Sequence, residues 1–262
     1  MRLVCLGTNG FLPTDEAQTA CYFLPEAGVL LDAGSGLYRT PSFMQSAPLD
    51  IYLSHAHGDH TSGLVYLFGS YFKWLAGQAG QPLSEENVGG FVERANALMR
   101  GTRIHAAPGA IFEVKGQYPL HGFDWQPLES SEPLREGGTL THFPLEHGGG
   151  CVGYRLDWPG HSLAYVTDTV ARPDSAYIRR IAGVDLLLHE SNNPNRLPGL
   201  AERIHHSYPD SAARIAAAAG VQRLVLIHKS PIESLDIRPD LASARRIFAN
   251  TEVAEDGMEL AF

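Results

Sequence analysis

The sequence predicts an α/β protein, a four-layer αβ/βα sandwich in which two mixed β-sheets pack face to face and helices cover their outer surfaces. Two observations support this prediction. Short apolar runs typical of strands dominate the beginning of the 262-residue chain. Later in the chain, strand-like runs alternate with segments whose apolar residues have helical spacing. This order of elements is typical of two packed sheets with helices outside.

The first strand is expected at residues 2–6, where apolar side chains alternate weakly. Residues 20–24 and 29–32 flank a turn that contains Pro and Gly, which is typical of a hairpin. Residues 50–54 form another largely apolar strand, and a cluster of histidines follows it directly. Further strands are predicted at 103–106, 122–127, 139–145, 151–157, 162–167, 186–190, 223–228 and 258–262.

Residues 61–78 and 84–99 have the apolar spacing of helices, and a break with Gly and Pro separates them. We expect them to form a helical insert at about 61–100 within a single domain that spans residues 1–262. Its aromatic residues indicate a core, with a lid over the site or a homodimer contact as the functional alternative. Later helices are predicted at 174–181, 211–219 and 241–248.

Charge and composition limit the kinds of partner. The formal net charge is −9 and the chain has no Lys/Arg-rich arm, so a general affinity for the nucleic-acid backbone is not expected. No apolar run reaches the length of a membrane span, and the apolar start is too short for a signal peptide, so we expect a cytoplasmic protein. The three cysteines are scattered without CxxC spacing, which indicates buried thiols.

Residues 54–60 have the sequence SHAHGDH and predict a metal site. His55 and His57 lie two residues apart at the end of a strand, so both imidazoles point to the same side. A glycine then lets the chain turn, and Asp59 and His60 follow in the loop. This HxHxDH pattern supplies two ligand sets, because the first two histidines can bind one metal ion while Asp59 and His60 bind a second.

Three more candidate ligands stand at predicted strand ends. They are His147, Asp168 and His228, each of which follows or ends an apolar strand. A single histidine at a strand end is more often structural, so each residue alone is weak evidence. Together, the three can complete a binuclear site.

Taken in this order, the residues resemble the motifs of the metallo-β-lactamase superfamily over nearly the whole chain. Asp32, in the segment LDAG, resembles the family's first motif, and HxHxDH resembles the second. The resemblance implies that Asp32 is structural and orients the HxHxDH loop through hydrogen bonds. It also implies that one metal ion is bound by His55, His57 and His147, that the second is bound by Asp59, His60 and His228, and that Asp168 bridges them.

The nitrogen and oxygen ligands suit two divalent zinc ions, with manganese or iron as alternatives. HxHxDH lacks the acidic replacement of the superfamily's di-iron redox branch, so the resemblance favours hydrolysis. Two dications with Asp59, Asp168 and a bridging hydroxide would have a net charge of about +1, which suits a monoanionic phosphodiester. Two such metal ions generate hydroxide from bound water near neutral pH, and Asp59 lies where it can accept the proton of that hydroxide.

Three further segments resemble the ribonuclease Z branch of the superfamily. They are PLEH with GYR between residues 144 and 155, LHES at 188–191, and His206 followed by Ser207 at the start of a predicted helix. In that branch the Glu and the His of the last two segments work together. The resemblance therefore implies that His206 contacts the phosphate and protonates the leaving group. It also implies that Glu190 orients the His206 imidazole and favours its protonated, charged form. A solvated pair of His205 and His206 is the alternative.

The sequence departs from ribonuclease Z in several places. That family has a long exosite arm for transfer RNA between the GYR segment and the bridging aspartate, whereas only residues 156–167 lie there in this chain. The family's Thr after His-Ser is Tyr208, and its arginine after the last ligand is Ile232. These departures and the acidic charge favour a small or cyclic phosphodiester over long nucleic acid.

The PhnP-like phosphodiesterases share these motifs and lack the arm. They also have a cysteine-rich structural zinc site near the N-terminus. Only Cys5 and Cys21 stand in that part of this chain, so no third metal ion is expected.

Three functions remain open from the sequence. The main prediction is a metal-dependent phosphodiesterase acting on a small anionic substrate, with ribonuclease Z-type RNA 3′ processing as a variant. The second is a hydrolase of lactones, esters or thioesters on the same binuclear site, and the third is a non-hydrolytic protein of a cofactor pathway. Surface or core roles are expected for the histidines without motif context, which are His105, His121, His142 and His161.

Overall fold

The structure is a computed structural model that describes residues 1–80, 82–118 and 122–262. Within these residues the first sheet has the strand order β14 (Glu259–Ala261), β1 (Arg2–Gly7), β2 (Cys21–Leu24), β3 (Val29–Leu31), β4 (Asp50–Tyr52), β5 (Arg103–Ala106) and β6 (Asp124–Pro127). The second sheet has the order β13 (Thr251–Val253), β12 (Arg223–Ile227), β11 (Leu186–Glu190), β10 (His161–Val166), β9 (Val152–Trp158), β8 (Thr139–Pro144) and β7 (Glu132–Pro133).

Helices connect the strands and cover the sheets. The α-helices are α1 (Gly58–Thr61), α2 (Leu67–Gln78), α3 (Val88–Gly101), α4 (Pro108–Gln117), α5 (Pro198–Arg203), α6 (Pro209–Ala219) and α7 (Leu241–Ile247). Short 3-10 helices are η1 (Ser35–Ser42), η2 (Ser62–Tyr66), η3 (Arg135–Gly137), η4 (Gly148–Gly150), η5 (Ala176–Arg179), η6 (Glu233–Leu235) and η7 (Arg238–Asp240).

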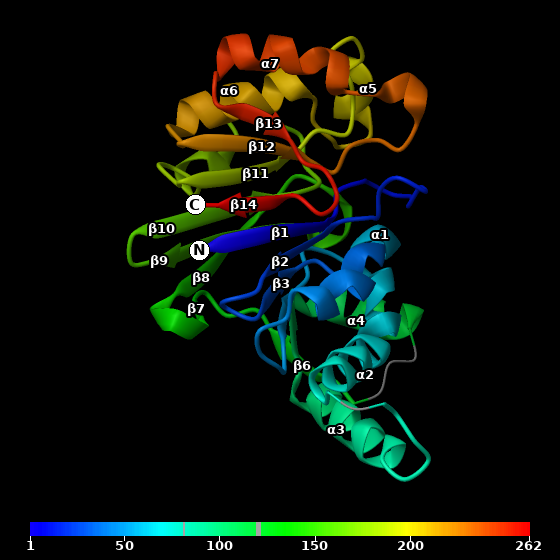
Figure 1. The fold of residues 1–262 in the computed structure, drawn as a ribbon. Helices are drawn as coiled ribbons and strands as arrows, with labels where there is room; N and C mark the ends of the chain where they lie inside the picture. The colour runs from blue at the N-terminus through cyan, green and yellow to red at the C-terminus, as the bar shows by residue number, and fades with distance from the viewer. Residues whose placement is uncertain (81, 119–121) are drawn as a thin grey trace.

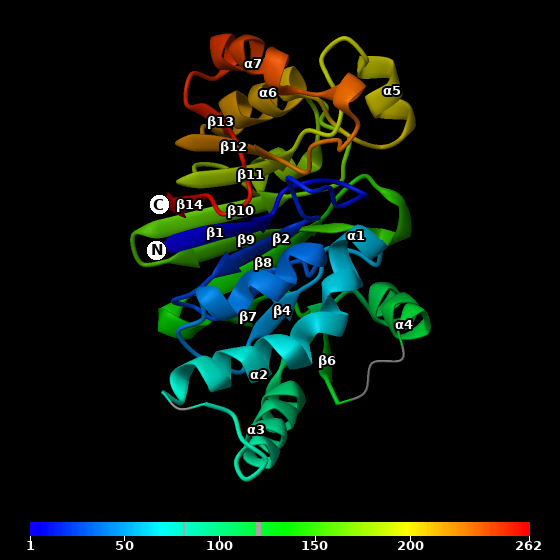
Figure 2. The same cartoon turned by 45° about the vertical axis from the view of Figure 1, so that its right-hand side comes forward.

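Alternation of side chains along the strands produces three hydrophobic layers. Leu3 and Leu188 point into the layer between the two sheets. Val4, next to Leu3, packs on the outer side of the first sheet with residues of η1, α2 and α3. Leu187, next to Leu188, packs on the outer side of the second sheet with residues of α6 and α7. Figures 1 and 2 show the same order of helices, sheet, sheet and helices. The four-layer αβ/βα sandwich predicted from the sequence is confirmed.

Strand direction brings the predicted motif residues to one edge of each sheet. The strands β3 to β6 are parallel to one another, and so are β10 to β13. β8 runs in the same direction as β10, because both are antiparallel to β9. The edge with α1, α4 and α5 lies on the right in Figures 1 and 2, and the two chain termini lie on the opposite side. Carboxyl ends of parallel strands are where open α/β sheets bind ligands.

Two predicted helices are corrected by the structure. Residues 174–181 contain only the short helix η5, because Arg172 N–H donates to Ser175 Oγ at 3.0 Å and Ile178 N–H donates to Ser175 O at 3.1 Å, which closes tight turns. The predicted helix at 61–78 begins as an α-helix only at Leu67. Gly63 lies so close to Gly34 that a Cβ there would be 2.0 Å from the Gly34 oxygen, so the chain packs as a 3-10 turn first.

The α-helices α1, α4 and α5 were not predicted. α4 and α5 both begin with a proline, Pro108 and Pro198, which is a common first residue of a helix. Their apolar residues are too few for a clear helical period. α2 and α3 pack on each other and extend away from the sheets at the bottom of Figure 1.

Candidate metal centre

The HxHxDH segment lies directly after β4, and His57 precedes the first turn of α1. His55 and His60 are almost fully buried, at 1% and 0% exposure. The Nε2 atom of His55 lies 2.9 Å from Nδ1 of His57. The two imidazoles predicted to share one side of the strand therefore meet at their ring nitrogens.

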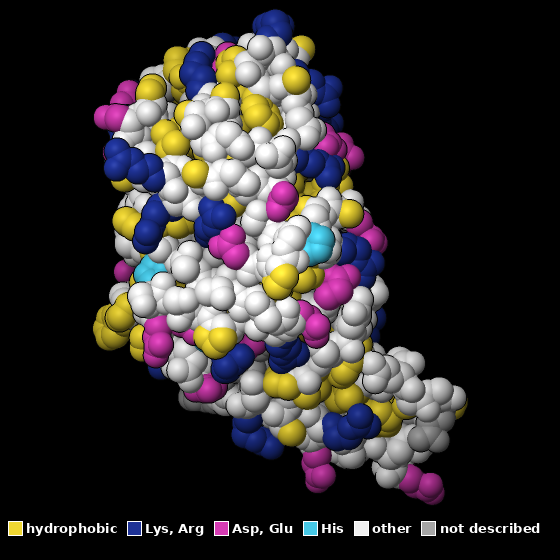
Figure 3. Space-filling model, turned by 90° about the vertical axis from the view of Figure 1, so that its left-hand side faces the viewer, with side chains coloured by type: hydrophobic (Ala, Val, Ile, Leu, Met, Phe, Trp, Pro, Cys, Tyr) yellow, Lys and Arg dark blue, Asp and Glu magenta, His cyan; other side chains and the backbone are white. Residues whose placement is uncertain are grey.

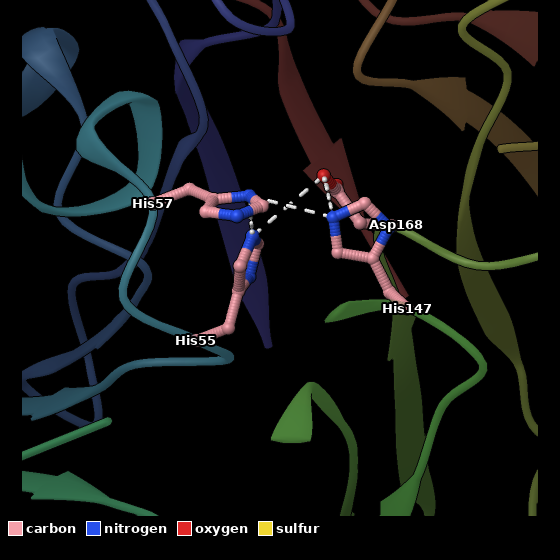
Figure 4. Close-up of side chains that lie close together, drawn as sticks. All are labelled: His55, His57, His147 and Asp168. Atoms are coloured by element: carbon pink, nitrogen blue, oxygen red, sulfur yellow. Dashed lines mark hydrogen bonds and ion pairs between the residues drawn. The ribbon is translucent and has the colours of Figure 1, made fainter. Parts of the chain in front are cut away.

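Residues from the second sheet meet this pair. His147 follows β8 and Asp168 follows β10, and both side chains point at the two histidines, as Figure 4 shows. His147 Nε2 is 3.4 Å from His57 Nδ1 and 3.6 Å from Asp168 Oδ2. One atom from each of the four side chains lies within 4.8 Å of the others. We refer to these four residues as the first ligand group.

A second ligand group consists of Asp59, His60 and His228, again with one atom each within 4.8 Å. The Nε2 atoms of His60 and His228 are 3.1 Å apart, and His228 Nε2 is 3.2 Å from Asp59 Oδ2. His228 follows β12 and has a positive φ of 51°. Gly10 packs against it so closely that a Cβ there would be 2.6 Å from His228 Cε1.

Asp168 joins the two groups. Its Oδ2 atom faces His55 Nε2 at 3.7 Å, in the first group. Its Oδ1 atom lies 3.2 Å from His228 Nε2 and 3.4 Å from His60 Nε2, in the second. One carboxylate thus presents one oxygen to each group, which is the arrangement a bridging ligand requires.

The protonation of His55, His147 and Asp168 fits bound cations, whereas Asp59 and the other nearby carboxylates raise the pKa of His60 against the effect of burial. Burial and the nearby His60 lower the pKa of His55, and burial lowers the pKa of His147, so both imidazoles stay neutral with lone pairs facing inward. Burial alone would raise the pKa of Asp168, but His228 and His60 hold it well below its usual range. Neutral imidazoles and ionised carboxylates are the forms that bind metal ions.

Asp32 holds the HxHxDH loop from behind. It is fully buried, with a positive φ of 57°. Its Oδ1 accepts the N–H of Ser54 at 2.7 Å, and its Oδ2 accepts the hydroxyls of Ser54 at 2.7 Å and Tyr165 at 2.6 Å. His60 Nδ1 donates to the same Oδ2 at 2.6 Å, which leaves His60 Nε2 for the second ligand group. These contacts are the hydrogen bonds expected of Asp32.

Two supporting residues were missed by sequence reasoning. Ser54 Oγ lies 2.9 Å from His55 Nδ1, so the serine links Asp32 to the first ligand group as well. Phe11 donates its backbone N–H to Asp59 Oδ2 at 2.8 Å, from a backbone with a positive φ of 24°. The position of Ser54 directly before the motif was a usable signal, whereas the contact of Phe11 depends on the fold of a distant loop.

Glu190 and His206 form a pair beside the two ligand groups. Glu190 is fully buried, and its Oε1 accepts His206 Nδ1–H at 3.0 Å. The same oxygen accepts the backbone N–H groups of Ser207 at 2.8 Å and Thr169 at 3.1 Å, and Oε2 accepts that of Asn192 at 2.9 Å. The carboxylate therefore fixes three separate loops as well as the histidine.

The ring of His206 faces the ligand groups. Its ring centre is 5.2 Å from that of His147 and 5.5 Å from that of His228. Its nearest ring nitrogen also lies within 4.8 Å of ligand atoms of Asp168 and His228. Burial alone would lower the pKa of His206, but Glu190 raises it to about 9. Glu190 therefore favours the protonated form of this imidazole at the edge of the site.

Comparison with known proteins agrees with this geometry. A family model described as "Beta-lactamase superfamily domain" matches residues 28–229. A ribonuclease Z from Methanosarcina mazei is 29% identical, and the alignment covers 99% of this chain and 97% of that protein. A ribonuclease Z from Microcystis aeruginosa is 30% identical, with 98% of this chain and 94% of that protein covered.

Solved structures share the fold. The metallo-β-lactamase fold protein YhfI from Bacillus subtilis has a TM-score of 0.75 at 20% identity, with 99% of each chain covered. A diphosphatase from the PhnP family has a TM-score of 0.69 at 17% identity, covering 100% of this chain and 97% of that one.

The chain belongs to the metallo-β-lactamase superfamily, in its ribonuclease Z-like branch. It is accordingly a metal-dependent hydrolase. The matched region contains the whole HxHxDH segment and extends past His228. The resemblance stated from the motifs is confirmed.

In this superfamily member, the described histidines without motif context, His105, His142 and His161, belong to neither ligand group. His105 is buried and stacks on Tyr52, with ring centres 4.4 Å apart. His142 and His161 are partly exposed on β8 and β10. His121 lies outside the described residues. Among the described residues, no helix is both long enough and apolar enough to cross a membrane.

Proposed function

We propose that this chain is a binuclear metal-dependent phosphodiesterase that acts on a small or cyclic phosphodiester. The observation that supports this proposal most strongly is the position of Asp168, whose two oxygens face the two ligand groups separately. We assign His55, His57 and His147 to one divalent ion, and Asp59, His60 and His228 to the other. Zinc suits this nitrogen and oxygen set, and manganese or iron are alternatives.

Bound divalent ions would lower the pKa of water and neutralise charge on a phosphodiester. The protein's own residues would handle the protons. Asp59 is held by the N–H of Phe11 at 2.8 Å and faces His228 at 3.2 Å, so its carboxylate is oriented toward the centre to accept a proton. His60 and His228 outweigh the effect of burial and hold the pKa of Asp59 far below its usual range, so the carboxylate is ionised and would carry the proton only transiently.

His206 would protonate the leaving group. Its Nδ1–H is held by Glu190, so the protonated ring has its second N–H, on Nε2, available for an oxygen of the substrate. Glu190 raises the pKa of His206 to about 9 against the effect of burial, and bound cations would act in the opposite direction. His205, the residue before it, contacts the site through its backbone carbonyl and makes no ion pair with Glu190 within the described contacts.

A small substrate is supported by the shape of the second sheet and by charge. β9 ends at Trp158 and β10 begins at His161, so only a tight turn stands where a long arm would emerge. The net charge is −9. The face shown in Figure 3 lies opposite the edge with α1, α4 and α5, and basic and acidic side chains are interspersed on it. The tight turn and the net charge favour a small diester over long nucleic acid.

RNA processing is the second candidate, because the relatives at 29% and 30% identity are both described as ribonuclease Z. The test is a panel of bis(p-nitrophenyl) phosphate, 2′,3′-cyclic nucleotides, a precursor transfer RNA and a lactone, each with Zn²⁺ or Mn²⁺ added. We expect turnover of the small diesters. Turnover of the lactone alone, or of the RNA alone, would contradict the proposal.

The role of His206 is tested on the same substrates with His206→Ala. We expect the rate on diesters to fall about 100-fold or more, the usual contribution of a general acid. His142→Ala is the matched control, since that histidine lies on β8 away from the ligand groups. Full activity of His206→Ala on every diester would exclude the assigned role.

A further inference from the structure

We infer that His205 is a positioning residue, and that its backbone carbonyl orients His147 toward the metal ion while the same turn delivers His206 to the substrate. The inference rests on the proposed function, because it takes His147 as a metal ligand. The imidazole of His205 has no part in it. The functional element is the left-handed backbone conformation of this residue.

The contact joins His147 to the chain after α5. His147 Nδ1–H donates to the carbonyl oxygen of His205 at 3.1 Å. With the proton fixed on Nδ1, the other ring nitrogen, Nε2, presents its lone pair toward Asp168 Oδ2 at 3.6 Å. Hydrogen bonding of the second ring nitrogen is a known way to set the tautomer and the orientation of a metal-binding histidine.

His147 has little other support. Three glycines follow it, and Gly149 and Gly150 have φ values of 72° and 73°, so the backbone after the ligand is unconstrained by side chains. Among the described contacts of its ring, the His205 carbonyl is the one hydrogen-bond acceptor outside the first ligand group. The orientation of this imidazole therefore depends on where the His205 carbonyl points.

A helix-ending motif sets that carbonyl. α5 ends with His205 N–H donating to Glu202 O at 3.2 Å and His206 N–H donating to Ala201 O at 2.8 Å. These are the two bonds of a Schellman motif, in which the residue at the position of His205 is left-handed and is most often glycine. His205 has a φ of 57°, as the motif requires. A non-glycine residue in this conformation is strained, so the surrounding contacts must hold it there.

The same motif places His206. It is the residue after the left-handed position, and its Nδ1 reaches Glu190 Oε1 at 3.0 Å. Rotation of the His205 backbone out of the left-handed region would move its carbonyl away from His147 and displace His206 as well. One turn of backbone thus couples a metal ligand to the residue proposed to contact the substrate.

Two substitutions separate backbone from imidazole. His205→Gly removes the imidazole but favours the left-handed conformation, whereas His205→Val has a β-branched side chain that disfavours it. Alanine disfavours the left-handed conformation less than valine does, so His205→Ala replaces His205→Val if the valine variant does not fold. Circular dichroism and thermal melting show whether each variant folds. Each variant is compared with the unaltered protein.

The first readout is zinc binding, measured as stoichiometry and as the affinity of each equivalent by competition with a chelator. We expect two equivalents in the unaltered protein and in His205→Gly. In His205→Val we expect about a 10-fold weaker affinity for one of the two equivalents, with His205→Ala between the two variants. The second readout is the visible spectrum of the cobalt-substituted protein, which should change in His205→Val and stay the same in His205→Gly.

The outcomes are distinguishable. Binding of both equivalents by His205→Val and His205→Ala with unaltered affinity and spectrum overturns the inference. Equal losses in His205→Gly and His205→Val also overturn it, because the imidazole would then be the functional element. Fewer than two zinc equivalents in the unaltered protein would instead contradict the proposed binuclear function.

Discussion

His60 and His147 come from the two different sheets that build the candidate metal centre, and they are held by different kinds of contact. We call the residues after strands of the first sheet the first half of the centre, and those after strands of the second sheet the second half. His60 is fully buried in the loop after β4, and its Nδ1 donates to the side chain of Asp32 at 2.6 Å. His147 lies in a glycine-rich loop after β8, and its Nδ1 donates to the backbone carbonyl of His205 at 3.1 Å. The first half is anchored by a buried carboxylate in the core, and the second by the conformation of a surface turn.

This difference shows where the site is rigid and where it can be adjusted. The carboxylate of Asp32 serves His60, Ser54 and Tyr165 at once, so the first half depends on a single buried group. In the second half, Glu190 and the turn at His205 have separate partners. We therefore expect substitutions in the first half to affect folding and both metal sites, and substitutions in the second half to affect activity more selectively.

The largest effect is expected for Asp32→Ala. It leaves His60 Nδ1 and the Tyr165 hydroxyl without their buried partner, and breaking such a buried pair lowers the free energy of unfolding by about 3–5 kcal/mol. We also expect loss of zinc from both sites. Urea denaturation and elemental analysis measure the two effects. Asp174→Ala is the control, because Asp174 is exposed. If the two variants had the same free energy of unfolding and the same zinc content, Asp32 would not anchor the first half.

A selective effect is expected for Glu190→Gln in the second half. Glutamine keeps an oxygen for the backbone donors but lacks the negative charge that raises the pKa of His206. We expect the rate on small diesters to fall about 100-fold with the zinc content unchanged. Because the two residues act as a unit, the double variant with His206→Ala should be no slower than His206→Ala alone. Additive losses in steady-state kinetics would show that Glu190 acts independently.

The smallest effect is expected where the two sheets meet. His105 on β5 is 3% exposed, and its Nδ1 lies 3.7 Å from Glu132 Oε1 on β7. Burial lowers the pKa of His105 below its ordinary value of 6.5, although Glu132 acts to raise it. Below pH 6.5 the unfolded chain therefore binds a proton that the folded protein lacks. The free energy of unfolding decreases as the pH is lowered, by at most about 1.4 kcal/mol per pH unit from this residue.

The measurement is the free energy of unfolding between pH 8 and pH 5, for the unaltered protein and for His105→Gln. The difference between the two proteins isolates this residue from the other histidines. We expect the unaltered protein to lose stability faster as the pH falls. A difference that does not change with pH would mean that His105 has the same pKa in the folded and the unfolded protein.

Part of the fold and of the site could be predicted because the information is local. The strands at 2–6, 50–54 and 223–228 are apolar runs, and the structure has β1, β4 and β12 at these places. The helix at 174–181 and the unbroken helix at 61–78 were wrong, because turn hydrogen bonds at Ser175 and the close packing of Gly63 outweigh apolar spacing. Such packing depends on chain segments that are distant in sequence.

The sequence by itself indicated the HxHxDH segment, because four candidate ligands stand within six residues at a predicted strand end and its turn. It also indicated His147, Asp168 and His228 as strand-end residues. Only the tertiary structure decided that Asp168 presents one oxygen to each ligand group, because that depends on the two sheets packing with the ends of β4, β8, β10 and β12 together. The turn at His205 was also decided there, since a carbonyl has no sequence signature and its direction follows from the backbone torsion angles.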